Sequence, residues 1–149
     1  NKILDQLLEN PYLKIHPPKS TDIENFGTNL LKRTISENPD VSGYDLIRTF
    51  VQYTAESIKY SIDQYIQLKN SDFLLIGSGG GVEHPIIKDE LIKHGYNYQS
   101  ISNYGIDSSI KEALLIAVLG ACKVINLSNS MPSVTGASDY SILGNVYNG

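Results

Sequence analysis

Apolar residues recur with helical spacing along the first part of the chain, and this pattern predicts three helices. Apolar residues recur every three or four positions over residues 3–8, 22–36 and 43–68, which is the spacing of one helical face. Residues 11–19 hold three of the six prolines and therefore predict an extended connector. The opposite face of the third helix is expected to be solvated and carries Arg48, Gln52, Glu56, Lys59 and Asp63.

Short-range patterns predict where these helices begin, because a hydroxyl or carboxylate there accepts hydrogen bonds from free backbone amides. Thr21 and Glu24 form a capping box for the second helix, and Ser42 precedes the third. The run Lys19-Ser20-Thr21 also offers a cation and two hydroxyls to an anion at a helix start. Simple capping by Thr21 explains the same residues and is the preferred interpretation.

Beyond the third helix the pattern becomes that of an α/β unit. Phe73 to Ile76 form a short apolar run bounded by turn residues, which predicts a strand buried on both faces. A glycine loop, Gly77-Ser78-Gly79-Gly80-Gly81, follows it, and His84-Pro85 opens a helix with proline at its first position. A second strand over residues 98–101 then predicts parallel pairing through a right-handed crossover.

The last third of the chain is predicted to contain one helix and an irregular tail. Ser109-Ile110-Lys111-Glu112 forms another capping box, and the helix behind it runs through Ala121. Residues 126–149 are rich in Ser, Asn and Gly, and their apolar anchors are Ile142, Leu143 and Val146. Two strands make a poor sheet, so more strands are expected from a portion upstream of this chain, which lacks an initiator Met.

Composition narrows the class of function. With 149 residues, 41% of them hydrophobic, the chain suits one globular domain, and its formal charge of −4 argues against a nucleic-acid or anionic-membrane partner. A single cysteine excludes a disulfide framework and a zinc site built from cysteines. The longest apolar run, residues 113–122, is too short to span a bilayer, and no secretory signal opens the chain. A cytoplasmic protein with no membrane partner is therefore expected.

The glycine loop is the strongest candidate for a binding site. A buried strand that ends in glycines and leads to a helix exposes backbone amides at the positive end of that helix. Gly79, Gly80 and Gly81 have no Cβ atoms, so a nucleotide can approach the backbone closely. Val82 stands where a dinucleotide fingerprint needs its last glycine, and no P-loop lysine follows. From spacing alone, nucleotide binding and a ligand-free tight turn are equally open.

No set of catalytic or metal-binding residues stands out in the sequence. His16, His84 and His94 lack metal-ligand spacing, and His84 is expected to cap its helix. Cys122 lies in an apolar helix and is expected to be an inert core residue. Asp107 is either a carboxylate facing a cleft at the end of a strand or a turn residue, and the turn is the preferred interpretation.

Four segments form an ordered set of motifs that covers nearly the whole chain. Two of them are the glycine loop, Leu75 to Gly81 with Pro85, and the helix start Gly105-Ile106 with Lys111 to Leu114. The first and last segments are Pro17-Pro18-Lys19-Ser20-Thr21 with Glu24 and Phe26, and Pro132-Ser133-Val134-Thr135-Gly136-Ala137-Ser138 with Leu143-Gly144. Together these four segments resemble the anhydro-N-acetylmuramic acid kinase family, and the first and last make the resemblance specific.

The resemblance implies the C-terminal part of an α/β, helix-rich RNase-H-like domain of the sugar kinase, Hsp70 and actin superfamily, with a buried strand, glycine loop and helix. Such kinases use ATP and Mg²⁺ to open the 1,6-anhydro ring of anhydro-N-acetylmuramic acid by water attack and to phosphorylate O6 in peptidoglycan recycling. The implied parent is a homodimeric, two-domain kinase whose N-terminal domain precedes residues 1–149. No residue here then inherits a catalytic or metal-binding role. Nucleotide binding carries over to Ser78, Gly79, Gly80 and Gly81, which would lie against the adenosine.

Some positions depart from the family pattern, and other functions stay open beside it. Asp22-Ile23 stands where the family usually has Gly-Arg, so any contact of that Arg is lost, whereas Ser109, Ile116 and Val118 are milder departures. An ATP-regulated binding protein of the Hsp70 type would use the same glycine loop. A partner or dimerisation domain without nucleotide would instead use the helix over residues 43–68.

Overall fold

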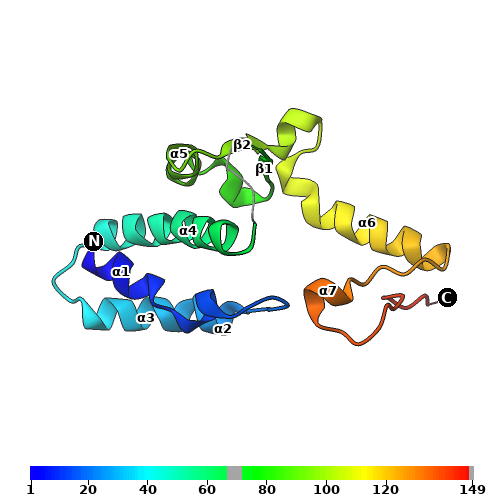
Figure 1. The fold of residues 1–149 in the computed structure, drawn as a ribbon, viewed down its shortest axis with the longest axis horizontal. Helices are drawn as coiled ribbons and strands as arrows, with labels where there is room; N and C mark the ends of the chain where they lie inside the picture. Colours follow the sequence, from blue (N-terminus) through cyan, green and yellow to red (C-terminus); the bar gives the residue numbers. More distant parts are fainter. Residues whose placement is uncertain (67–71, 148–149) are drawn as a thin grey trace.

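The computed structural model describes residues 1–66 and 72–147, apart from the side chains of Glu24 and Val82. Figure 1 shows a group of N-terminal helices, a small sheet beside the end of α4, and a C-terminal arm made of α6 and α7. The order of helices, strand, loop, helix, strand and helix is the predicted one. The α/β, helix-rich class is therefore confirmed.

The N-terminal part is built from helices that the apolar periodicity predicts. Their bounds are Lys2–Leu8 for α1, Ile23–Phe26 for α2, Thr28–Glu37 for α3 and Gly43–Tyr65 for α4. The cap of α4 is confirmed, because the Asp45 backbone N–H donates to Ser42 Oγ at 3.2 Å. The last part of the predicted third helix, residues 67–68, lies outside the described residues.

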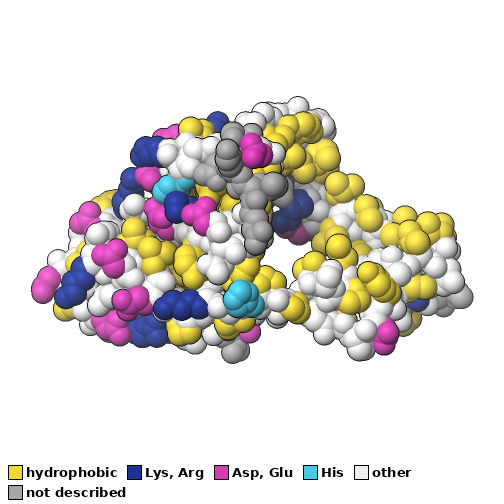
Figure 2. Space-filling view, in the orientation of Figure 1, with side chains coloured by type: hydrophobic (Ala, Val, Ile, Leu, Met, Phe, Trp, Pro, Cys, Tyr) yellow, Lys and Arg dark blue, Asp and Glu magenta, His cyan; other side chains and the backbone are white. Residues whose placement is uncertain are grey.

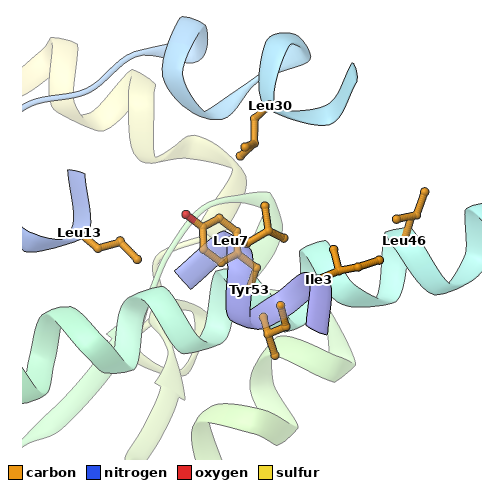
Figure 3. Packing of buried hydrophobic residues seen from close by; sticks show 7 residues of the cluster. Ile3, Leu7, Leu13, Leu30, Leu46 and Tyr53 are labelled. Atoms are coloured by element: carbon orange, nitrogen blue, oxygen red, sulfur yellow. The ribbon is translucent and has the colours of Figure 1, made fainter. Parts of the chain in front are cut away.

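The apolar faces of these helices meet in one buried cluster. Figure 3 shows side chains of α1, α3 and α4 converging with Leu13 of the connector. The cluster consists of Ile3, Leu4, Leu7, Leu13, Leu30, Leu46 and Tyr53. Leu7 is 6% exposed and Tyr53 is 5% exposed, so this cluster is buried and supplies hydrophobic stabilisation to the N-terminal part.

Two predictions for the N-terminal part are corrected. The helix expected over 22–36 is broken at Gly27, whose backbone leaves the helical region and approaches Ile23 so closely that a Cβ at Gly27 would overlap the Ile23 carbonyl oxygen. At its start Asp22 Oδ1 accepts from the Asn25 N–H at 3.3 Å, and the capping box of Thr21 and Glu24 stays a prediction because the Glu24 side chain lies outside the described residues. The connector is not fully extended, because residues Pro11–Lys14 form a 3-10 helix.

The sheet has two parallel strands, β1 (Leu74–Gly77) and β2 (Asn97–Ser100), joined through α5 (Pro85–Lys93). Parallel pairing is the predicted arrangement and is confirmed. The expectation that the first strand is buried on both faces is wrong for this chain. Leu75 packs against the cluster of Ile62, Leu91 and Tyr96, whereas Leu74 and Ile76 on the other face are 37% and 46% exposed. Helices α4 and α5 therefore cover one face of β1.

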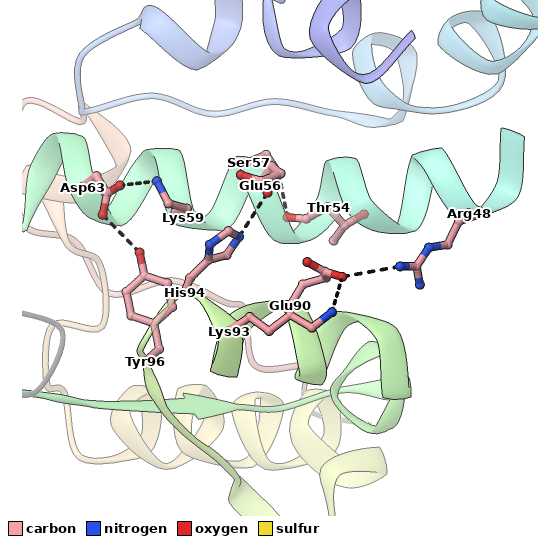
Figure 4. A network of polar contacts seen from close by, with 10 residues as sticks. All are labelled: Arg48, Thr54, Glu56, Ser57, Lys59, Asp63, Glu90, Lys93, His94 and Tyr96. Carbon is pink, nitrogen blue, oxygen red and sulfur yellow. Dashed lines mark hydrogen bonds and ion pairs between the residues drawn. The ribbon is translucent and has the colours of Figure 1, made fainter. Parts of the chain in front are cut away.

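The polar face of α4 is partly solvated as expected, since the side chains of Arg48 and Asp63 are 48% and 47% exposed. It also meets α5 and the residues that follow it (Figure 4). Arg48 Nη2 lies 3.4 Å from Glu90 Oε1, and His94 Nε2 lies 3.1 Å from Glu56 Oε1. Tyr96 donates its hydroxyl to Asp63 Oδ1 at 3.1 Å. These contacts were not predicted, because the complementary polar groups come from α5 and the segment after it, which periodicity within α4 cannot reveal.

Helix α6 (Lys111–Val124) is confirmed as an element but is not packed like a core helix. None of its residues, all of which the structure describes, is buried, and Figure 2 shows hydrophobic side chains over this arm of the molecule. The turn before α6 is capped by Asp107, whose Oδ1 accepts from the Ser109 N–H at 2.8 Å, so Ser109 is not the cap. Over residues 1–66 and 72–147, no helix is both long and apolar enough to span a membrane.

The tail behind α6 folds back through short helix α7 (Pro132–Thr135) and side-chain hydrogen bonds. Asn129 Oδ1 accepts from the Leu143 N–H at 2.6 Å, and Ser130 Oγ accepts from the Ser141 N–H at 2.7 Å. Two of the predicted apolar anchors are only loosely covered, since Leu143 and Val146 are 48% and 64% exposed. Polar contacts therefore hold the tail more than apolar burial does.

Leu7→Ala tests the N-terminal cluster. Removing a buried leucine side chain costs about 2–5 kcal/mol of the free energy of unfolding, because it leaves a cavity as well as losing apolar burial. Ile23→Ala is the matched control, since Ile23 is 80% exposed, and it is expected to change stability by less than about 0.5 kcal/mol. Urea denaturation measures both, and equal effects of the two changes would contradict the assigned core.

Tyr96→Phe tests the polar contact between α4 and the segment after α5. Burial, and next the hydrogen bond to Asp63, raise the pKa of Tyr96 to about 12. An unfolded chain ionises Tyr96 near its ordinary pKa of about 10. The stabilisation that the protonated Tyr96 hydroxyl gives the folded protein is therefore complete below pH 10 and is lost as the pH rises toward 12. Wild type is expected to have a higher free energy of unfolding than Tyr96→Phe at pH 8. Up to about 3 kcal/mol of this difference is expected to be lost by pH 12. An advantage that is the same at pH 8 and pH 11 in urea denaturation would contradict this assignment.

Candidate functional site

The glycine loop joins β1 to α5, and its backbone conformation requires glycine at one position, Gly79. Gly79 has φ +92° and ψ 175°, a region that residues with a side chain enter only under strain. A 3-10 turn over Gly80–Glu83 follows, and α5 begins at Pro85. A Cβ added at Gly80 or Gly81 would meet no described atom within 4 Å beyond the adjoining residues, so the loop backbone can be approached from outside.

A pocket of about 280 Å³ lies beside this loop, slightly below the usual size range of small-molecule sites. Its walls come from every element of the α/β unit together with α4, and most of them are apolar. The lining residues are Thr54, Ile58, Leu75, Ile76, Gly77, Ser78, Gly81, Ile87, Leu91 and Tyr98. Such a lining accommodates a flat, uncharged group, and the loop residues Ser78 and Gly81 form part of the pocket wall.

The structure therefore brings Ser78 and Gly81 to the pocket and leaves Gly80 open beside it. The structure also brings Lys111 to the loop, a residue that belongs to one of the motif segments but was given no role from the sequence. Lys111 Nζ lies 3.7 Å from the position of a Cβ added at Gly79. The motif containing Lys111 was the available signal, but Lys111 lies 32 residues after Gly79 in sequence, and only the fold brings the two together.

Burial and charge distinguish the groups around the site. The pKa of Tyr98 is raised, first by burial and then by the nearby negative charge of Glu83. Glu83 Oε1 accepts a hydrogen bond from Ser100 Oγ at 3.0 Å. The pKa of Asp107 is lowered by hydrogen bonds from the Ser109 backbone and hydroxyl. Asp107 is therefore a turn residue, as preferred from the sequence, rather than a carboxylate facing a cleft.

The Lys19-Ser20-Thr21 segment is not an anion site in this structure. Lys19 Nζ donates to the carbonyl oxygens of Tyr12 and Leu13, both at 3.3 Å. The same ammonium lies over the rings of Tyr12 and Tyr65, at 4.7 and 5.2 Å from their centroids. Lys19 thus ties the connector to α4, and its positive charge is already engaged.

The remaining candidates have structural positions. His84 occupies the cap position of α5 as expected, but its side chain makes no capping hydrogen bond with the described residues. Cys122 is half-buried on α6, so the expectation of a core cysteine is wrong because α6 has no buried side. Among the described residues, no group of three or more His, Cys, Asp or Glu side chains is placed to hold a metal ion.

Comparison with known proteins identifies the family of this chain. The family model described as anhydro-N-acetylmuramic acid kinase matches residues 1–149, which is the whole chain. The chain belongs to the anhydro-N-acetylmuramic acid kinase family. The resemblance drawn from the four motif segments is therefore confirmed, and the chain is a member of a kinase family.

Individual members of the family match along almost the full chain. An anhydro-N-acetylmuramic acid kinase of Clostridioides difficile (strain 630) is 37% identical over 149 residues, which is 97% of this chain and 38% of that protein. One of Francisella tularensis subsp. novicida (strain U112) is 35% identical over 148 residues, with the same coverage. One of Vibrio parahaemolyticus is 31% identical over 147 residues, or 39% of its length. The chain thus spans less than two fifths of the length of these curated relatives.

The first and last family segments lie against each other in the fold. A Cβ added at Gly136 would lie 3.5 Å from Pro18 Cγ, so the two segments are in close contact. Gly136 ends α7 with φ +76°, and its N–H donates to the Pro132 carbonyl oxygen at 2.8 Å. The glycine of the last segment is therefore required by backbone conformation at a point of close approach between the two segments.

Gly79→Ala tests the loop conformation. A residue with a Cβ held in the region that Gly79 occupies costs about 1–3 kcal/mol of strain. Gly80→Ala is the control, because Gly80 lies in the 3-10 turn and a Cβ there meets open space. Chemical denaturation is expected to show a loss of about 1–3 kcal/mol for Gly79→Ala and a clearly smaller change for Gly80→Ala. A Gly79→Ala variant as stable as wild type would show that the loop has another conformation.

Proposed function

We propose that this chain is the C-terminal, nucleotide-binding portion of an ATP-dependent kinase of anhydro-N-acetylmuramic acid. In the proposed reaction, which requires Mg²⁺, water opens the 1,6-anhydro ring, and the γ-phosphoryl group of ATP is transferred to O6 of the sugar with release of ADP. The observation that carries the proposal is an open glycine loop beside an apolar pocket in a chain that belongs to this kinase family.

The pocket and the loop match the two chemically different halves of an adenosine nucleotide. We place the adenine base among the apolar walls formed by Ile58, Ile87 and Leu91, because a flat heterocycle gains from leaving water there. The ribose then lies against the loop backbone from Ser78 to Gly81, where the absence of Cβ atoms at Gly80 and Gly81 leaves room. In this arrangement the chain binds and orients the nucleotide and does not itself transfer the phosphoryl group.

The chemical step is assigned to a part of the protein outside residues 1–149. Among the described residues, no group of three or more His, Cys, Asp or Glu side chains is placed to hold a metal ion, and we propose that the Mg²⁺ ligands lie outside this chain. We propose an actin-like, two-domain kinase, homodimeric and cytoplasmic, whose upstream portion supplies the catalytic carboxylate, the sugar site and the metal ligands. The greater length of the relatives is consistent with this division, since the chain spans 38% of the kinases of Clostridioides difficile and Francisella tularensis.

Nucleotide-dependent stabilisation of the intact protein tests the binding step. A ligand that binds the native state alone at about 100 times its Kd raises the free energy of unfolding by about 2.7 kcal/mol. ATP is therefore expected to raise the melting temperature of wild type. Gly80→Leu is expected to abolish that rise, because its side chain fills the open approach to the loop.

Gly43→Leu is the matched control, since Gly43 begins α4 and a Cβ there also meets no described atom within 4 Å. It is expected to leave the response to ATP unchanged. The reaction itself is followed by incubating the intact protein with ATP, Mg²⁺ and anhydro-N-acetylmuramic acid and detecting the 6-phosphate by mass spectrometry. Binding of ATP without formation of this product would contradict the proposed kinase activity.

A further inference from the structure

A cationic side chain lies against the glycine loop at the position where the loop backbone requires glycine. Lys111 Nζ is 3.7 Å from the point where a Cβ at Gly79 would lie, an ordinary contact distance. The space beside Gly79 that a side chain would occupy is thus next to an ammonium group. Gly79 also has a positive φ, so the ammonium group lies beside the residue at which the loop conformation requires glycine.

The fold explains why the side chain of Lys111 is held there. Lys111 is the first residue of α6, and it follows a 3-10 turn over Ser108–Ile110 that Asp107 caps. This turn packs against the 3-10 turn Gly80–Glu83 of the glycine loop. The start of α6 and the loop therefore meet through these two turns, and the Lys111 side chain extends from the first residue of α6 to the loop.

The acidic side chains around Lys111 leave its charge available to a ligand. Glu112 Oε1 lies 3.4 Å from Lys111 Nζ, but the two side chains are 74% and 48% exposed, and such surface ion pairs contribute little. Asp107 accepts from both the N–H and the hydroxyl of Ser109, at 2.8 and 2.7 Å. Glu83 accepts from the hydroxyl of Ser100 at 3.0 Å. An incoming anion at Gly79 would therefore have to compete with one weak surface contact.

We propose that Lys111 binds a phosphate group of the nucleotide and makes the site select nucleotides over nucleosides. The inference rests on the proposed nucleotide binding and adds a specificity-determining residue to it. The pocket at the loop recognises an apolar, flat group and cannot by itself distinguish adenosine from ATP. An ammonium placed beside Gly79 supplies that distinction, because a charge-assisted hydrogen bond forms with a phosphate oxygen and with no atom of an uncharged nucleoside.

The test compares ATP with adenosine on the intact protein by isothermal titration calorimetry. Lys111→Met removes the charge and keeps most of the side-chain volume, and it is expected to weaken ATP binding about tenfold, or about 1.4 kcal/mol. Adenosine affinity is expected to stay unchanged, so the ratio of the two affinities falls. Lys32→Met, on the exposed surface of α3, is the matched control with the same change of charge, and both affinities are expected to stay at the wild-type values.

Three results would overturn the assignment. ATP affinity that is unchanged in Lys111→Met means that the ammonium does not contact a phosphate. An equal loss for adenosine and ATP means that Lys111 supports the loop structure rather than reading charge. Lys111→Arg keeps the positive charge and is therefore expected to keep ATP affinity within about threefold of wild type. A loss of ATP affinity in Lys111→Arg as large as in Lys111→Met would contradict the proposal. A wild-type protein that binds neither ligand would instead refute the proposed function on which this one depends.

Discussion

The packing of α4 against two separate apolar clusters is the interaction on which the rest of the structure depends. Leu46 and Tyr53 of this helix lie in the N-terminal cluster, and Ile62 near its other end lies in the cluster under the sheet. Because one helix of 23 residues belongs to both clusters, it fixes the position of β1 and α5 relative to the N-terminal helices. Thr54 and Ile58, between the clusters, then form one wall of the pocket beside the glycine loop.

The polar contacts of α4 add orientation to this apolar packing. Ion pairs and hydrogen bonds at half-exposed positions contribute modestly to stability, so the contacts of Arg48 and Glu56 matter mainly by fixing how α5 lies on α4. Tyr96 is different, because its ring is buried in the second cluster while its hydroxyl reaches Asp63. One side chain thus joins the apolar and polar sides of the same interface.

Apolar surface on the sheet and on α6 is consistent with a larger protein around this chain. A helix that is apolar all round is normally buried, yet Leu115 and Ile116 of α6 are 53% and 68% exposed. The face of β1 that carries Ile76 is similarly open. The proposed upstream portion of the kinase would cover these surfaces, and the greater length of the relatives provides the chain to do so.

Local signals predicted much of the fold and less of the candidate site. The cap at Ser42 and the glycine loop follow from residues adjacent in sequence, and the parallel pairing of β1 with β2 follows from the order strand, helix, strand, so the sequence was sufficient to predict them. The break at Gly27 was missed because a single glycine inside a periodic segment is compatible with a continuous helix. Lys111 was missed for a different reason, since its place beside Gly79 depends on how two distant turns pack.

Amide hydrogen exchange of the intact protein, with and without saturating ATP, tests the central claim most directly. If the nucleotide lies on the glycine loop, peptides that contain residues 77–83 will exchange more slowly with ATP, and those from the Lys19-Ser20-Thr21 segment will not respond. Saturation with ATP that leaves exchange at residues 77–83 unchanged, and slows it at another segment, would contradict the site assigned to this chain.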